Sequence, residues 1–350
     1  MTRQNDNNCE SLNHRRSWLW ITPADGRSVC DYGRVKTPRP LPAEIARVPF
    51  TCQEAVDAGV TLRRLRHGEL DAPSRGIRVP QDGSGQGREG TALSEALRPF
   101  TRITSFSAVS HATAFTFWSF PGFLPGQEDP LIHISRPDTR AIPRRKGVVG
   151  HVGQFFDDEI VHVEGVLVTS RPRTWLDNAR RMSVEELTVV ADHLLRLPRA
   201  AFEIRTEPFC TLGQLSDMLD RHKGTPGIRK ARLALELARV GSDSAPETRL
   251  RLALNAACLP EPMLNMPIEL RPGVIRQPDL SYPEYRIAVE YDGDGHSEPQ
   301  QIVRDIDREE DFSRGGWLLV RISKRHMQNQ ALSALSKVRG ALLSRGWVPK

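Results

Sequence analysis

Carboxylates gather in the stretch AVEYDGDGHS, residues 288–297, at the end of a predicted strand. Side chains alternate along a strand, so Glu290 and Asp292 lie on the same face. Two carboxylates in these positions repel each other unless a positive charge separates them. Hard cations such as Mg²⁺ or Mn²⁺ prefer oxygen ligands of this kind. The spacing therefore predicts a metal site, and the alternative is an acidic surface turn.

A third carboxylate comes from the preceding predicted strand, residues 275–280, which contains Asp279. A tight turn over 282–284 leads into the next strand, residues 285–291. If the two strands pair antiparallel, Asp279 lies across or diagonally from Glu290, with roughly 5 to 8 Å between their Cβ atoms. We therefore expect Asp279, Glu290 and Asp292 to be the metal ligands.

Two further side chains have types that suit hydrolysis. The neutral imidazole of His296, beyond a glycine-rich loop, could take a proton from a water. Glu247 lies in the first turn of a predicted helix over 245–257, where it either interacts with the helix dipole or approaches the metal. A bound Mg²⁺ can activate water and stabilise a transferring phosphate. An EF-hand calcium loop is excluded, because its sixth and twelfth positions are Ser297 and Val303.

The helix predicted over 300–314 presents Gln301, Asp305 and Arg308 on one face. We expect part of this face to border the site and Gln301 and Arg308 to contact DNA. The alternative is a solvated face with a local Asp–Arg pair. A strand over 317–322 and a helix over 327–344 follow, so the region predicts an α/β unit with a hairpin and a βα crossover.

The segments PDLSYPEYRIAVEYDGDGHS and DIDREEDFSRGGWLLVRIS resemble the DUF559 endonuclease-like domain over residues 240–345. That domain has the PD-(D/E)xK nuclease fold and is similar to the very-short-patch repair endonucleases. The resemblance implies a mixed sheet flanked by helices, with Asp279 and Glu290 as the two motif acids, His296 as the base and Glu247 as the acid of the first helix. Asp292 stands where the lysine of the pattern would stand, so the resemblance leaves the mechanism open.

Residues 44–80 predict a DNA-binding winged helix-turn-helix. Thr51 caps a short helix that ends near Ala58, Gly59 makes a turn, and a second helix starts near Thr61, followed by the strand GIRVP. Leucines mark the buried side of the second helix, at Leu62, Leu65 and Leu70. Its arginines are expected to contact DNA, largely at phosphates: Arg63, Arg64 and Arg66. The alternative is a helical hairpin with a solvated basic face.

The remaining segments predict the domain order of the chain. Residues 1–43 are expected to be a disordered leader and the glycine-rich residues 81–92 a linker. Residues 93–225 predict an α/β middle domain, and residues 226–350 the endonuclease-like domain. Ser183 and Glu186 predict a capping box in the middle domain. Its histidines lie on separate predicted elements without ligand spacing, so we expect structural or surface roles for His111, His133, His151 and His162.

Residues 47–205 resemble the N-terminal part of AbiEi-type antitoxin proteins, through SHATAFTFWSF and SRPRTWLDNARR. This resemblance implies DNA binding by the winged helix and a middle region without catalysis. It also implies a toxin–antitoxin or defence-system partner.

Composition adds limits to these expectations. A net charge of +6 is compatible with a nucleic-acid partner. No apolar run approaches the roughly 20 residues of a membrane helix, and five scattered cysteines without a C-x-x-C pair fit a reducing compartment. We expect a cytoplasmic α/β (α+β) protein, with a homodimer left open. The first hypothesis is a metal-dependent DNA endonuclease. The alternatives are a non-catalytic DNA-binding regulator of the antitoxin type, with an inactive nuclease fold, and a plain interaction module.

Overall fold

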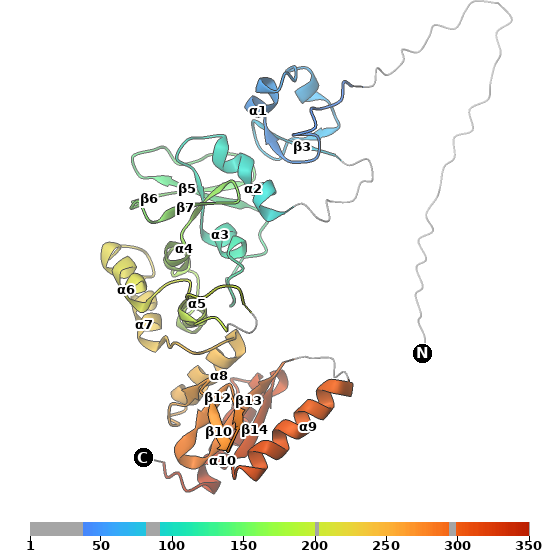
Figure 1. The fold of residues 1–350 in the computed structure, drawn as a ribbon. Helices are drawn as coiled ribbons and strands as arrows, with labels where there is room; N and C mark the ends of the chain where they lie inside the picture. The colour runs from blue at the N-terminus through green and yellow to red at the C-terminus, as the bar shows by residue number, and fades with distance from the viewer. Residues whose placement is uncertain (1–37, 82–91, 200–202, 294–298, 350) are drawn as a thin grey trace, which may run out of the picture. The chain divides into compact units, whose positions relative to one another are not determined.

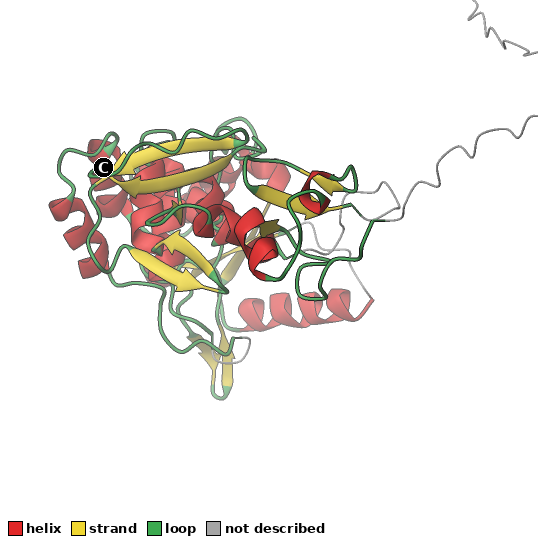
Figure 2. Ribbon diagram, turned by 90° about the horizontal axis from the view of Figure 1, so that it is seen from above, coloured by secondary structure: helices red, strands yellow, loops and turns green. Residues whose placement is uncertain are grey.

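The computed structural model describes residues 38–81, 92–199, 203–293 and 299–349. Contacts group Pro40–Lys350 into one compact unit. Helices and sheets mix throughout the described chain, which confirms the α/β (α+β) class (Figures 1 and 2). His296 lies outside the described residues, as do the expected leader up to residue 37 and most of the expected linker. No helix in the described ranges is both long and apolar enough to cross a membrane.

The first element group is a small three-stranded antiparallel sheet with strand order β1-β3-β2. Thr51 caps α1 as expected: its side chain accepts from the Glu54 amide, and the Glu54 carboxylate accepts from the Thr51 amide. The elements are β1 (Phe50–Thr51), α1 (Cys52–Asp57), the 3-10 turn η1 (Arg64–Arg66), β2 (Leu70–Asp71) and β3 (Ile77–Pro80).

The second helix of the expected helix-turn-helix does not form. Only the 3-10 turn η1 lies between Gly59 and Gly68, and Leu62, expected on the buried side, is 63% exposed. Leu65 and Leu70 are buried as expected. So short a segment between two glycines has too few residues to offset the cost of helix nucleation. The predicted recognition helix is therefore wrong, and the arginines of this segment lie on a turn.

A five-stranded mixed sheet of order β6-β5-β4-β8-β7 forms the next region. Helix α2 packs on it through Leu97 and Phe100, and Ile77 of β3 joins the same core. Helix α3 leads from β4 toward β5. The bounds are α2 (Leu93–Arg102), β4 (Ala108–Val109), α3 (His111–Phe117), β5 (Ile132–Pro137), β6 (Val148–Gly153), β7 (Ile160–Val163) and β8 (Val166–Thr169).

Four helices after β8 share a core with α3, centred on the fully buried Trp175, whose indole nitrogen donates to the Leu187 carbonyl at 2.9 Å. Residues 228–238, which the sequence assigns to the last domain, contribute Ala231, Ala234 and Ala238 to this core. The helices are α4 (Arg171–Asn178), α5 (Val184–Leu195), α6 (Leu212–Arg221) and α7 (Ile228–Leu237).

The capping box expected at Ser183 is only half formed. The Ser183 hydroxyl accepts from the Glu186 amide at 3.1 Å. The Glu186 carboxylate instead accepts two hydrogen bonds of 2.8 Å from the Arg249 guanidinium. A charged partner on another helix thus takes the place of the local backbone amide, because charge-assisted bidentate pairs are stronger than neutral ones.

The last region is a four-stranded sheet of order β14-β13-β12-β9 with a separate β10–β11 hairpin. β13 and β14 are parallel, and α9 makes the crossover between them, lying along the sheet in Figure 1. The elements are α8 (Ala245–Ala256), β9 (Met263–Leu264), β10 (Ile268–Arg271), β11 (Val274–Arg276), β12 (Leu280–Tyr282), η2 (Pro283–Tyr285), β13 (Ile287–Asp292), α9 (Pro299–Arg314), β14 (Leu318–Ser323), η3 (Lys324–Met327) and α10 (Leu332–Ser344).

The strand expected over 275–280 is split between β11 and β12. Pro278 lies at the break, and proline has no amide hydrogen to donate to a ladder. The tight turn expected after it is the 3-10 turn η2, closed by Arg286 in the left-handed conformation with φ 50°. The two strands still pair antiparallel, so the break leaves the expected hairpin in place.

A buried ion pair joins α5 to α8. The Arg251 guanidinium, with no exposed surface, donates to the Asp192 carboxylate at 2.8 Å. The same carboxylate accepts from the Thr248 hydroxyl at 2.9 Å and from the Arg239 amide at 2.7 Å. Three donors, two from α8 and one from Arg239 before it, therefore depend on one carboxylate of α5, which itself is only 1% exposed.

Replacing Asp192 tests this junction. Asp192→Ala leaves the buried Arg251 guanidinium with only its longer 3.5 Å contact to Glu261, so we expect the unfolding free energy to fall by about 3–5 kcal/mol. Urea unfolding followed by circular dichroism measures the change. The control Asp220→Ala removes the exposed pair with Arg232, 3.1 Å apart, and should cost less than about 1 kcal/mol. Equal losses in the two variants would contradict a special role for Asp192.

Candidate functional site

The pairing of β12 with β13 brings two of the predicted acids together. Leu280 pairs with Val289, so continuing the register by one step sets Asp279 opposite Glu290. The Tyr291 amide donates to the Asp279 Oδ2 atom at 2.7 Å, which fixes this carboxylate at the end of the hairpin. Glu290 is only 8% exposed. The hairpin therefore holds two carboxylates at one end of the sheet, as the alternation of side chains predicts.

Burial and neighbouring acidic charges perturb both carboxyl groups. The pKa of Asp279 is raised to about 7, first by burial and then by the charges of Glu247 and Glu290. Burial also raises the pKa of Glu290, while the nearby Arg308 guanidinium opposes the rise. A shift of this kind means that the ionised form is disfavoured in the protein as it stands. A cation placed between the two groups would offset that cost.

Helix α9 supplies an arginine to this pair, so part of its polar face borders the two carboxylates. The Arg308 Nε atom donates to the Glu290 Oε1 atom, and its Nη2 atom donates to the Gln277 carbonyl at 2.8 Å. Arg308 therefore neutralises a protein carboxylate here rather than projecting toward solvent. The side chain of Gln301, the other residue of this face expected to contact DNA, lies outside the described residues.

Asp292 and Arg321 form a looser pair at the edge of the acid group. Arg321 on β14 is the register partner of Glu290, and its guanidinium lies 3.9 Å from the Asp292 carboxylate. The Asp292 side chain is 47% exposed. Asp292 thus lies nearer to solvent than the other two acids.

Glu247 has a defined structural role. Its carboxylate accepts from the Asp243 amide at 2.9 Å, the Ser244 hydroxyl at 2.7 Å and the Asn265 side-chain amide at 3.0 Å. The Asn265 backbone amide in turn donates to the Asp279 carbonyl at 2.9 Å. Glu247 therefore stabilises the start of α8 and, through Asn265, the segment that carries Asp279. Its charge also contributes to the raised Asp279 pKa.

The two carboxylates suit Mg²⁺, which needs few protein ligands, better than a metal that protein ligands enclose on all sides. Mg²⁺ keeps several waters and is commonly held by one or two carboxylates. Asp279 and Glu290 meet that requirement, whereas Glu247 is already engaged by three donors. Over the described ranges, no three acidic side chains in this region have ligand atoms that all lie within 4.8 Å of one another.

The sequence missed a group of histidines in the middle region. His111, His133 and His151 converge, with ligand nitrogens all within 4.8 Å of one another, so the expectation of scattered histidines is wrong for these three. His162, the fourth, is exposed on β7. The missed signal is strand pairing: β5 and β6 are parallel, and His133 and His151 lie on adjacent strands. That pairing depends on residues far apart in the chain.

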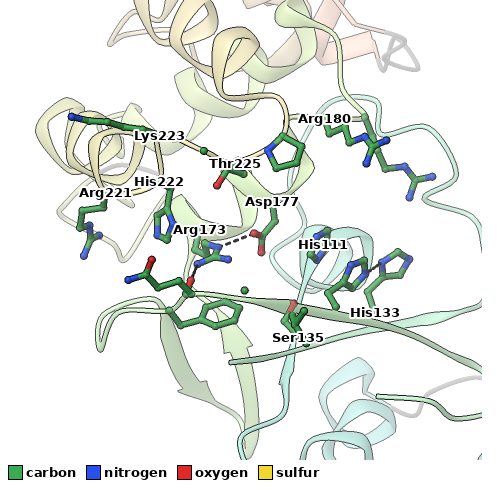
Figure 3. Close-up of a pocket in the computed structure, with 18 of the residues that line it drawn as sticks. His111, His133, Ser135, Arg173, Asp177, Arg180, Arg221, His222, Lys223 and Thr225 are labelled. Atoms are coloured by element: carbon green, nitrogen blue, oxygen red, sulfur yellow. Dashed lines mark hydrogen bonds and ion pairs between the residues drawn. The ribbon is translucent and has the colours of Figure 1, made fainter. Parts of the chain in front are cut away.

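The histidines line one side of a cavity of about 750 Å³ (Figure 3). The opposite side comes from α4 and the C-terminal end of α6, with Arg173, Asp177, Arg221 and His222. The pKa of His111 and that of His151 are both lowered to about 3, mainly by burial. The charges of His133 and Arg181 act in the same direction on both rings, and that of His111 also acts on His151. The rings are therefore neutral at physiological pH.

The raised pKa of Asp279 makes stability pH-dependent. The group is protonated when folded and ionised when unfolded between about pH 4 and 7, so its stabilising contribution is lost as the pH rises through 7. Asp279→Asn removes this loss. We expect the variant to match wild type below about pH 4, where the unfolded carboxyl is also protonated, and to exceed it by up to about 4 kcal/mol at pH 8 without metal. Thermal unfolding in chelator measures this, with Glu284→Gln as the exposed control. A variant less stable at pH 8 would contradict the repulsion.

No family model matches the chain. Two curated proteins of Mycobacterium tuberculosis are similar to it: Uncharacterized protein Rv2248 (strain ATCC 25618 / H37Rv) and Uncharacterized protein MT2308 (strain CDC 1551 / Oshkosh), each 28% identical over 192 residues. The match covers 55% of this chain and 66% of each relative, just under two thirds of their length. Among solved structures, the crystal structure of the RV2827C protein from Mycobacterium tuberculosis matches 54% of this chain and 71% of its own, with 17% identity and a TM-score of 0.34.

Proposed function

We propose that the C-terminal region is a metal-dependent endonuclease that hydrolyses phosphodiester bonds in DNA. The observation that carries the proposal is the Asp279–Glu290 pair, two carboxylates that the β12–β13 register holds together at the end of a largely buried sheet. Their pKa values are raised, so the fold bears an electrostatic cost at this point. Such costs are common at functional sites, because catalysis needs perturbed groups.

Each residue of the pair has a role in this proposal. Asp279 and Glu290 would hold Mg²⁺ or Mn²⁺, which when bound supplies an activated water and charge stabilisation at the phosphate. Arg308, beside Glu290, would exchange its carboxylate partner for a phosphate oxygen as the substrate enters. Glu247 and Asn265 would keep the Asp279 segment in position. Asp292 would lie at the solvent side, and His296 keeps its expected role as the base.

DNA is the polyanion that the sequence features favour. The net charge is +6, and Arg63 and Arg66 are exposed on the turn that replaces the second helix. A three-residue 3-10 turn is too short to fill a major groove, so these arginines suit phosphate contacts, which position a protein without reading the sequence. A toxin–antitoxin or defence-system partner and a cytoplasmic location remain predictions.

One observation favours a second candidate, a non-catalytic DNA-binding regulator with an inactive nuclease fold. The Arg308 guanidinium already neutralises Glu290, and Asp292 takes the position of the lysine in the nuclease pattern. In this case the arginine would be a permanent substitute for the metal. The two candidates differ in what happens when the acids are removed.

Cleavage of a supercoiled plasmid with Mg²⁺ or Mn²⁺ tests the proposal. Asp279→Asn and Glu290→Gln each remove a metal ligand, so we expect the cleavage rate to fall at least about 100-fold while DNA affinity stays within about twofold. The exposed carboxylate variant Glu284→Gln is the control and should cleave like wild type. Equal cleavage by the acid variants would identify a contaminating nuclease. DNA binding without cleavage by wild type would favour the regulator.

Arg308 separates the two candidates further. Arg308→Ala frees the Glu290 carboxylate, so the nuclease proposal predicts tighter Mg²⁺ binding by calorimetry together with slower cleavage, since the phosphate contact is lost. The exposed Arg314→Ala, which removes a surface pair with Glu310, is the matched control. If Arg308→Ala binds no metal and is simply destabilised, Arg308 is the permanent neutralising charge of an inactive site.

A further inference from the structure

We propose that the cavity between β5, β6, α3 and α4 is a transition-metal site of the zinc class. Its ligands would be the imidazoles of His111, His133 and His151, and the carboxylate of Asp177 would lie beside the ion as a neighbouring negative charge. This site is separate from the acid pair of the proposed nuclease and does not depend on that function.

The three imidazoles come from separate elements and meet at one point. His111 opens α3, His133 lies on β5 and His151 on β6. The His133 Nδ1 atom is 2.9 Å from the His151 Nε2 atom, and all three ligand atoms lie within 4.8 Å of one another. Ligands of tetrahedral zinc, with Zn–N near 2.0–2.1 Å, are separated by about 3.3 Å. Small side-chain adjustments would therefore bring all three nitrogens around one ion.

Local hydrogen bonds prepare His111 for this role. Its Nδ1 atom is 3.0 Å from the Ser110 hydroxyl, which also accepts from the Ser135 hydroxyl at 2.7 Å. A partner at one ring nitrogen fixes the ring and leaves the other nitrogen for a metal. The backbone of His111 has φ 49°, an uncommon conformation for a non-glycine residue. The centroid of its ring lies 3.6 Å from the centroid of the His151 ring, and the two rings are stacked.

Asp177 is the independent observation that points to a cation. Its side chain is 4% exposed, and its Oδ1 atom accepts from the Arg173 Nε atom at 2.7 Å. Its Oδ2 atom is buried and has no hydrogen-bond partner among the described residues. A buried carboxylate oxygen without a partner is costly. Figure 3 shows the Asp177 carboxylate pointing into the cavity between Arg173 and His111.

A buried network holds Asp177 in this orientation. Arg173 also donates to the Glu159 carboxylate at 2.5 Å and to the Gln154 carbonyl at 2.7 Å, and the His222 ring lies 2.7 Å from the same carboxylate. Arg173 is thus fixed on its own partners and does not turn toward Asp177 Oδ2.

The cavity leaves room at the ion for a further ligand. Three protein nitrogens with an open fourth position are the arrangement of catalytic zinc sites, whereas structural sites are closed by four residues. The exposed residues Arg180, Arg181 and Lys223 also line the cavity. Their charges suit a small anion or an anionic substrate as that ligand.

Metal titration of the full chain tests the site. We expect the chelator-treated protein to bind one Co²⁺ with the visible absorption of a tetrahedral ion, and Zn²⁺ to displace it. His151→Ala should weaken binding at least about 100-fold through loss of a ligand, and Asp177→Asn about 10- to 100-fold. The matched control His162→Ala removes an exposed histidine of β7 outside the cluster and should bind like wild type.

Three controls keep the outcome specific. Asp279→Asn should keep the tetrahedral Co²⁺ absorption of wild type, because it alters only the C-terminal acid pair. Circular dichroism shows whether His151→Ala is folded. X-ray absorption of the zinc-loaded wild type, which needs no variant, should show nitrogen or oxygen neighbours with imidazole scattering. Sulfur neighbours, binding retained in His151→Ala, or no binding by wild type would each overturn the proposal.

Discussion

The buried carboxylate of Asp192 sets the geometry on which the C-terminal site depends. It binds Arg251 and Thr248 of α8 and the Arg239 amide before it, and so fixes α8 against α5. The first turn of α8 holds Glu247, which reaches the segment of Asp279 through Asn265. The bidentate Glu186–Arg249 pair adds a second link between the same helices. The buried polar cluster around Asp192 thus fixes the position of the helix and loop that surround the Asp279–Glu290 pair.

Burial disfavours the charged form of the side chains in both the acid pair and the histidine cluster, and it shifts their pKa values in opposite directions. Burial raises the pKa of the carboxyls Asp279 and Glu290 and lowers that of the imidazoles His111 and His151. In both cases the low-dielectric surroundings disfavour the charged form of the side chain. A hard cation would offset the cost at the carboxylates, and a softer one would use the lone pairs of the neutral rings. Ligand type thus separates the two proposed metals.

Local rules predicted the elements whose stabilising contacts are also local. The Thr51 cap and the α8 helix depend on residues within a few positions, and the structure confirms both. The convergence of Asp279 with Glu290 followed from strand alternation and one turn. The predicted helix from Thr61 was wrong, because the leucine spacing was helical but the segment between two glycines was too short. At Ser183, Glu186 left the expected cap for Arg249, 63 residues away.

The sequence by itself determined the acid-bearing hairpin, because alternation and a tight turn place Asp279 beside Glu290 without help from distant segments. Only the tertiary structure decided which other groups surround that pair, including Arg308 from α9 and the Asn265 side-chain amide that donates to Glu247. It alone assembled His111, His133 and His151 around a cavity with Asp177. Those contacts join residues that lie 18 or more positions apart, and the free energy that forms them comes from packing whole elements together, which no local pattern encodes.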